Sequence, residues 1–247
     1  MAMKSKLLIL VFTLIAALVV SGCTGDAYSE LQLASARGQT DMVAVMLDNG
    51  ADVNEPNKHG KTPLMLAAGN NHAETTRLLL ERNASINAQD IDGMTALIMA
   101  ASSGHTEVIN VLMEAGADIN GTNKYGATAI TNAAFFNHTE ALKALLSGKI
   151  KADSERNENA LLFSAGLGNN EIIQILLDYG VDVNARGKNG RTPLMAAVEF
   201  NHPATVELLL KNGADPKARD SDGDSVMRIA EGNGNKAILK LLNDFQL

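Results

Sequence analysis

The chain has 247 residues, with 21 lysines and arginines against 28 aspartates and glutamates, and a formal net charge of −7. An acidic chain lacks the basic surface that nucleic-acid phosphates require, so we expect no nucleic-acid partner. It contains one cysteine and no tryptophan. The single cysteine excludes a disulfide within the chain as a source of stability.

The N-terminus has the pattern of an export signal. Lys4 and Lys6 precede an apolar run from Leu7 to Val20, which is shorter than the roughly 20 residues needed to span a bilayer. We predict a signal peptide over residues 1–22. The following segment, Val20-Ser21-Gly22-Cys23, resembles the bacterial lipoprotein cleavage box, in which the cysteine becomes the acylated N-terminus. The alternative is an ordinary signal peptide that happens to end at a cysteine.

The lipoprotein resemblance implies both an anchor and a location. Residues 23–27 would form a short lipidated tether, attached to the membrane through Cys23 alone. By the same resemblance, Thr24 favours the outer membrane, with the protein on its periplasmic face.

From Tyr28 onward a two-helix pattern recurs every 33 residues, with one interval of 31. Each copy begins with a residue that can cap a helix, and nine residues later has a residue that tolerates positive φ at a helix end. The caps are Ser29, Thr62, Thr95, Thr128, Asn159, Thr192 and Ser225, and the helix-ending residues are Gly38, Asn71, Gly104, Asn137, Gly168, Asn201 and Gly234. One such hairpin cannot bury its own apolar face, so the copies must stack on one another.

The period and its motifs resemble the ankyrin repeat. Thr62-Pro63-Leu64 and Thr192-Pro193-Leu194 match one motif, and the segments at residues 50–54, 116–120 and 180–184 match or vary the Gly-Ala-Asp-Val-Asn motif. The resemblance implies an all-α solenoid over residues 28–247, made of about seven repeats including two caps. Its helical hairpins would be joined by loops that resemble β-hairpins.

One copy departs from the pattern. Between Leu146 and Asn159 the chain is two residues short, and the expected glycines are replaced near Lys149 and Asn157. We expect a different turn there. Two interpretations stay open: tolerated variation in a surface loop, or a reshaped tip that presents Arg156 to a partner.

No set of residues predicts catalysis or a metal site. His72, His105, His138 and His202 occupy one equivalent repeat position, about one repeat apart, so we interpret them as structural. The acidic run at residues 220–224 partly resembles a calcium loop but has Ser225 where that loop needs glycine. We expect no cofactor, no metal and no enzymatic activity.

The middle copies carry aromatic residues where ankyrin repeats bind partners. By the family resemblance, the loop tips and the positions seven and eight residues after each cap face a concave groove. In this chain these positions hold Tyr125, Phe135, Phe136, Leu167 and Phe200. We predict a partner-binding patch there, because exposed aromatic residues commonly anchor interfaces. The alternative is that the rings cover one another, or cover the gap left by the short loop.

Three basic residues are predicted to rim this patch, namely Arg156, Lys188 and Arg191. They favour a protein partner with an acidic surface. The expected function is a monomeric, non-enzymatic interaction scaffold in the bacterial periplasm, either a toxin-neutralising immunity protein or an accessory of a stress-response enzyme. The alternative is a passive envelope scaffold or assembly factor without a groove ligand.

Overall fold

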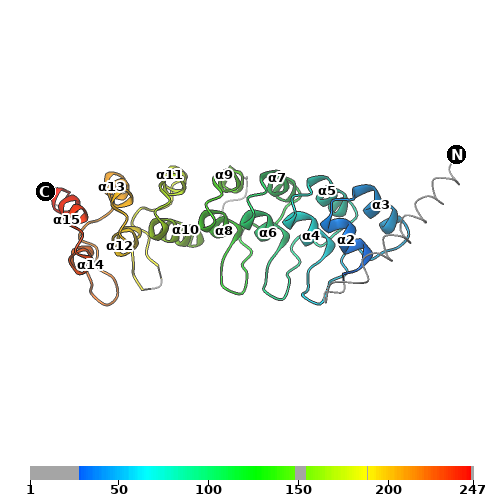
Figure 1. Ribbon diagram of the computed structural model, residues 1–247, viewed down its shortest axis with the longest axis horizontal. Coiled ribbons are helices and arrows are strands. Elements are labelled where there is room, and N and C mark those ends of the chain that lie inside the picture. The colour runs from blue at the N-terminus through cyan, green and yellow to red at the C-terminus, as the bar shows by residue number, and fades with distance from the viewer. Residues whose placement is uncertain (1–27, 148–153, 188, 246–247) are drawn as a thin grey trace.

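The computed structural model describes residues 28–147, 154–187 and 189–245, and for residues 154–157 it describes the backbone but not the side chains. These ranges contain fourteen helices and no strand, apart from an isolated bridge between Arg219 and Ser225. The helices form two rows along one elongated solenoid (Figure 1). The predicted all-α solenoid is confirmed, whereas the predicted signal peptide, tether and Cys23 lie outside the described residues.

Each repeat contributes one helix to the inner row and one to the outer row. The inner row comprises α2 (Glu30–Ala36), α4 (Pro63–Gly69), α6 (Ala96–Ser102), α8 (Ala129–Phe135), α10 (Ser154–Leu167), α12 (Pro193–Glu199) and α14 (Val226–Asn233). The outer row comprises α3 (Thr40–Asp48), α5 (Ala73–Glu81), α7 (Thr106–Glu114), α9 (Thr139–Ser147), α11 (Asn170–Asp178), α13 (Pro203–Lys211) and α15 (Lys236–Asp244). We number the repeats one to seven by these pairs. None of these helices is long and apolar enough to cross a bilayer.

The predicted helix boundaries are confirmed in six repeats. In each of these the Ser or Thr cap has extended backbone, and its hydroxyl accepts a hydrogen bond from the N–H three residues later, as Thr62 does from Met65. The predicted helix-ending residues have positive φ in all seven repeats, including Asn71, Asn137 and Asn201. Two local rules, one for each end of the inner helix, therefore fix its length.

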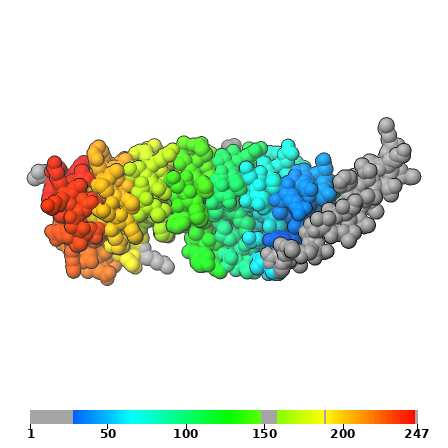
Figure 2. Space-filling model, viewed as in Figure 1, coloured from blue at the N-terminus to red at the C-terminus, as the bar shows by residue number. Residues whose placement is uncertain are grey.

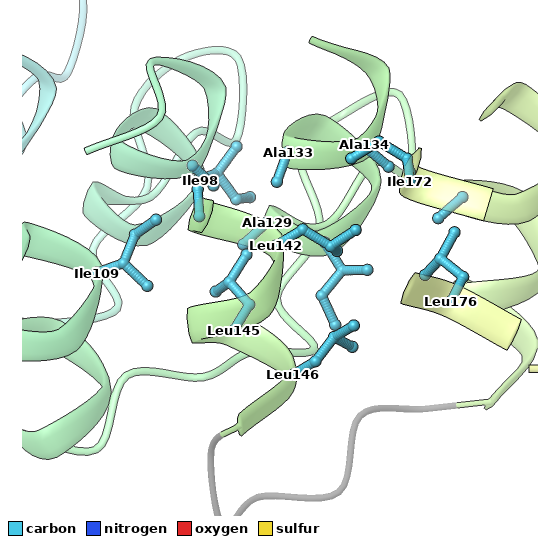
Figure 3. Packing of buried hydrophobic residues seen from close by; sticks show 14 of the residues in the cluster. Ile98, Ile109, Ala129, Ala133, Ala134, Leu142, Leu145, Leu146, Ile172 and Leu176 are labelled. Atoms are coloured by element: carbon cyan, nitrogen blue, oxygen red, sulfur yellow. The ribbon is translucent and has the colours of Figure 1, made fainter. Parts of the chain in front are cut away.

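The core runs continuously between the two rows. Small residues such as Ala133 let inner helices approach closely, and long aliphatic residues fill the space toward the outer row. Figure 3 shows Leu142 and Leu145 of α9 lying between Ile109 of the preceding repeat and Leu176 of the following one. Each of these leucines is fully buried, which contributes about 1.5–3 kcal/mol per side chain.

Histidines join successive repeats. The Nε2 atoms of His72, His105, His138 and His202 lie 2.9–3.1 Å from backbone carbonyls at the end of the preceding inner helix. Their shared structural role explains why four of the five histidines occupy one repeat position. In repeat five this position is Asn169, whose side chain does not cap α11.

Most repeats are joined by long loops that we call fingers. Residues 49–62, 82–95, 115–128, 179–192 and 212–225 each link an outer helix to the next inner helix with fourteen residues. A glycine with positive φ lies near each tip, for example Gly93 and Gly126. The fingers extend from the inner row on one side of the solenoid (Figure 1).

Repeat five has no comparable finger. Only residues 148–153 link α9 to α10, and α10 begins at Ser154 and has 14 residues, where the other inner helices have seven or eight. Asn159 therefore lies inside a helix, and its prediction as an N-cap is wrong. Because residues 154–160 contain neither glycine nor proline, nothing in this segment interrupts the helix. Figure 2 shows the resulting notch, between the finger before α8 and the finger before α12.

Candidate functional site

Five large apolar side chains are exposed on three neighbouring inner helices. They are Phe135 (49% exposed), Phe136 (50%), Phe163 (53%), Leu167 (44%) and Phe200 (62%). We call this set the aromatic ridge. Four of its members were predicted from the sequence, whereas Phe163 was not.

The ends of the inner helices position the ridge. Phe136 and Phe200 are the C-cap residues of α8 and α12, and Phe135 is the last residue of α8. Phe163 and Leu167 are four residues apart on α10 and therefore share one helix face. The regular repeat thus places equivalent positions of three adjacent copies in a row.

The rings of the ridge contact one another without becoming buried. Phe135 meets Phe136 with ring centroids 5.1 Å apart and planes at 88°, and meets Phe163 at 6.5 Å and 89°. Both are edge-to-face arrangements, which are favourable for aromatic rings. The interpretation that the rings cover one another is therefore correct in part, but about half of each side chain still faces solvent.

A glycine lets Phe200 lie against its neighbour. A Cβ atom on Gly166 would be 3.3 Å from the Phe200 ring and 3.9 Å from Ala196. The missing side chain therefore allows the ring of α12 to pack on the backbone of α10. This contact connects Phe200 to the helix that carries Phe163 and Leu167.

The exposure of Phe163 could have been predicted from the sequence, but its position in the repeat is buried or partly buried in other copies. It lies four residues after Asn159, and equivalent positions hold Leu66, Met99 and Ala196, which are buried or partly buried. Its i, i+4 spacing with Leu167 would have indicated a shared helix face. The signal becomes visible once residues 154–167 are recognised as one helix.

Tyr125 lies apart from the ridge, on the finger before α8. Its side chain is 78% exposed, and the Nζ atom of Lys124 lies 5.1 Å from its ring centroid. Lys124 also forms an ion pair with Asp92 on the preceding finger. The hydrogen bond to Asp92 raises the pKa of Lys124. Tyr125 is thus a solvent-facing aromatic residue beside Lys124, whose positive charge is paired with Asp92.

The predicted basic rim is only partly described. Lys188 and the side chain of Arg156 lie outside the described residues, although the backbone of Arg156 belongs to α10. The guanidinium of Arg191 forms an ion pair with Glu199 and lies 3.7 Å from Asp220. Its positive charge is therefore balanced within the chain.

The early repeats differ from this site. Asn70 and Ser102 occupy ridge-equivalent positions, and each side chain donates a hydrogen bond to a backbone carbonyl of its own helix. Among the side chains that the structure describes, there is no cluster of metal-ligating groups. An open depression between α11 and α13, lined partly by Glu171, Glu207 and Lys211, lies on the outer row.

The chain matches a known family model along most of its length. The model described as ankyrin repeats (3 copies) matches residues 8–90, 31–123, 83–156 and 132–220. No curated protein matches the sequence.

Solved structures agree with this assignment. The human ASB11 ankyrin repeat domain is 26% identical, with a TM-score of 0.75, and the match covers 88% of this chain and 98% of that one. The ankyrin repeat domain of Bcl-3, described as a unique member of the IkappaB protein family, is 24% identical with a TM-score of 0.78, covering 88% and 99%. The chain belongs to the ankyrin-repeat family.

Proposed function

We propose that this protein is a non-enzymatic scaffold that binds another protein through the aromatic ridge and Tyr125. Ankyrin repeats generally mediate protein–protein interactions. The observation that carries the proposal is the half-exposed state of five large apolar side chains in three adjacent repeats. Contiguous apolar surface of this kind is typical of interaction sites.

The energetics favour a partner over a purely structural role. Fully burying one phenylalanine contributes roughly 1.5–3 kcal/mol, and about half of that gain is still available at Phe135, Phe136 and Phe163. Aromatic residues near the centre of an interface commonly dominate its affinity. An acidic partner surface stays a prediction that depends on Arg156 and Lys188, since Arg191 is already paired.

We further propose that the scaffold acts in the bacterial periplasm, anchored to the outer membrane through acylated Cys23. The basic start, the apolar run and the cysteine at residues 20–23 support this location. Neutralising a toxin and assisting a stress-response enzyme are both compatible with an anchored scaffold that binds a protein.

The binding test compares two double variants of the full chain. The tagged chain is recovered from the cells that produce it, and co-purifying proteins are quantified by mass spectrometry. We expect a partner that Phe135→Ser/Phe136→Ser loses and that Val45→Ser/Phe245→Ser retains, because Val45 in α3 and Phe245 at the end of α15 are exposed apolar residues of the outer row in the terminal repeats. Equal recovery with both variants would show that the ridge binds no partner.

The alternative of a passive envelope scaffold is favoured by the mutual contacts of the rings. It predicts that Cys23→Ala abolishes function while Phe135→Ser/Phe136→Ser preserves it. If a partner binds the aromatic ridge as proposed, the double serine variant loses function even when the protein stays on the membrane.

A further inference from the structure

We propose that the partner inserts a β-hairpin into the notch of repeat five, replacing the missing finger. The hairpin would donate a backbone N–H to the carbonyl of Tyr125 and pack apolar side chains on the aromatic ridge. This inference rests on the proposed protein-binding function and specifies the shape and chemistry of the partner segment.

Neighbouring fingers are joined by a backbone hydrogen bond in a fixed register. The donor is the backbone N–H of the residue that lies four positions before the helix cap of one repeat. The acceptor is the carbonyl of the residue that lies three positions before the cap of the preceding repeat. Ile91 donates to His59 at 3.1 Å, Lys124 to Asp92 at 2.9 Å, and Ser221 to Asn189 at 2.9 Å. We call this series the finger ladder.

The ladder stops at Tyr125. Its carbonyl is the next acceptor in the register, and among the described residues no donor reaches it. The corresponding donor position in repeat five is Glu155, which lies in the first turn of α10 instead of a finger. Among the described residues, this carbonyl therefore has no backbone donor and borders the notch, like an unpaired group at the edge of a sheet.

The notch provides room for one hairpin. The fingers on both sides of it have fourteen residues, whereas the link between α9 and α10 has six. The space-filling view is open at this point (Figure 2). Because the notch and the ridge belong to the same three repeats, one partner segment can contact both.

The ion pairs that the structure describes beside the notch favour an uncharged segment. On one side Lys124 is paired with Asp92, and on the other Arg191 is paired with Glu199 and lies near Asp220. A charged tip would lose hydration without gaining an unpaired counter-charge among the described side chains. Apolar or aromatic tip residues would instead bury Tyr125 and the ridge, while the backbone extends the ladder as in strand addition.

The test uses disulfide-cyclised hairpin peptides with randomised tips, selected on the full chain purified in detergent. We expect selected tips to be rich in aromatic and aliphatic residues. N-methylation of one tip amide removes the donor and is expected to weaken binding roughly tenfold. If every singly N-methylated hairpin binds as tightly as its parent, or if no hairpin is selected, the insertion proposal is wrong.

A second variant fills the notch. Residues 148–159 are replaced by a copy of residues 115–128, which restores a fourteen-residue finger, and the melting transition checks that the protein still folds. We expect this variant to lose hairpin binding at least tenfold, and Phe135→Ser/Phe136→Ser to lose it as well.

The two variants separate the proposals. Hairpins that bind the notch-filled variant normally but not the double serine variant would overturn the insertion and support the ridge. Hairpins that bind the double serine variant normally would contradict the ridge as the binding site. Self-association of the full chain that disappears in the notch-filled variant would identify a second copy as the occupant and overturn the partner hairpin.

Discussion

The edge of one ring meets the face of the other where Phe163 of α10 packs against Phe135 of α8, with centroids 6.5 Å apart and planes at 89°. This contact joins repeats four and five at the junction where the finger is missing. The ridge is therefore a short bridge between repeats as well as an exposed surface. Its two roles predict different consequences for stability and for binding.

Stability should depend little on Phe163 and strongly on its neighbour Leu161. Phe163 is 53% exposed, whereas Leu161 is 0% exposed. We expect Phe163→Ala to lower the free energy of unfolding by about 1 kcal/mol and Leu161→Ala by about 2–5 kcal/mol. Urea denaturation measures both. A cost at Phe163 as large as that at Leu161 would mean that the ring serves the core and not a partner.

Ser164 is a second residue of α10 for which the repeat comparison makes a prediction. The equivalent position is alanine in the six other repeats, for example Ala133 and Ala197. Ser164 is fully buried, and its Oγ atom has no hydrogen-bond partner among the described residues. We expect Ser164→Ala to stabilise the protein by about 1–3 kcal/mol in urea unfolding, because the buried hydroxyl is removed. A loss of stability would reveal a partner for that hydroxyl.

The regular repeats could be predicted from the sequence because their signals are local. A capping hydroxyl such as Thr95 and a helix-ending residue such as Asn137 act on the backbone within a few residues. Repeat five could not be predicted in this way. Asn159 fits the cap register, but residues 154–158 also favour helix, and the short link from α9 leaves too little chain for a finger.

The same distinction holds for the candidate site. Phe135, Phe136, Leu167 and Phe200 occupy register positions, so their exposure followed from the repeat. Phe163 and the unused Tyr125 carbonyl depend on how repeat five deviates, and a motif alignment does not contain that information. The pairing of Arg191 with Glu199 likewise depends on the side-chain conformations of residues eight positions apart.

Asn169 is the position where the series of histidine contacts is interrupted. Each histidine reaches the carbonyl of the residue seven positions after the preceding cap, which at this junction is Phe135. We expect Asn169→His to stabilise the protein by about 0.5–1.5 kcal/mol by adding the missing hydrogen bond. Asn137 would lie beside the new ring, as Asn71 lies at the equivalent position before His105. Chemical denaturation measures the change in the free energy of unfolding. His138→Ala is the control, because it removes one of the existing histidine contacts and should destabilise the protein. If Asn169→His destabilises the protein, a histidine at this position does not make the same contact as the other four.

Cys23 should determine where the protein is found. Each methylene of an acyl chain that enters a bilayer contributes about 0.8 kcal/mol, and stable anchoring takes more than one chain. We expect Cys23→Ala to move the protein from the membrane fraction to the soluble periplasmic fraction, and mass spectrometry of the N-terminal peptide to show lipid on the unmodified sequence only. A Cys23→Ala protein that stays in the membrane fraction would indicate that another part of the chain holds it there.

The ion pair at the edge of the notch makes a prediction about charge. The hydrogen bond to Asp92 raises the pKa of Lys124, and the bond to Glu140 likewise raises the pKa of Lys143. Since these pKa values are raised on folding, any stabilisation is present below pH about 10.4 and is lost as the pH rises through the folded-state pKa. We expect Asp92→Asn to lower the pKa of Lys124 toward its ordinary value and to leave that of Lys143 unchanged, as measured by an NMR titration of the side chains.

The Asp92→Asn variant would also leave the Lys124 charge unpaired beside Tyr125, so hairpin peptides with acidic tips should bind it more tightly than they bind the unmodified chain. If the Lys124 pKa does not change, Asp92 does not hold this charge in solution, and the preference of the notch for an uncharged segment loses its basis on that side.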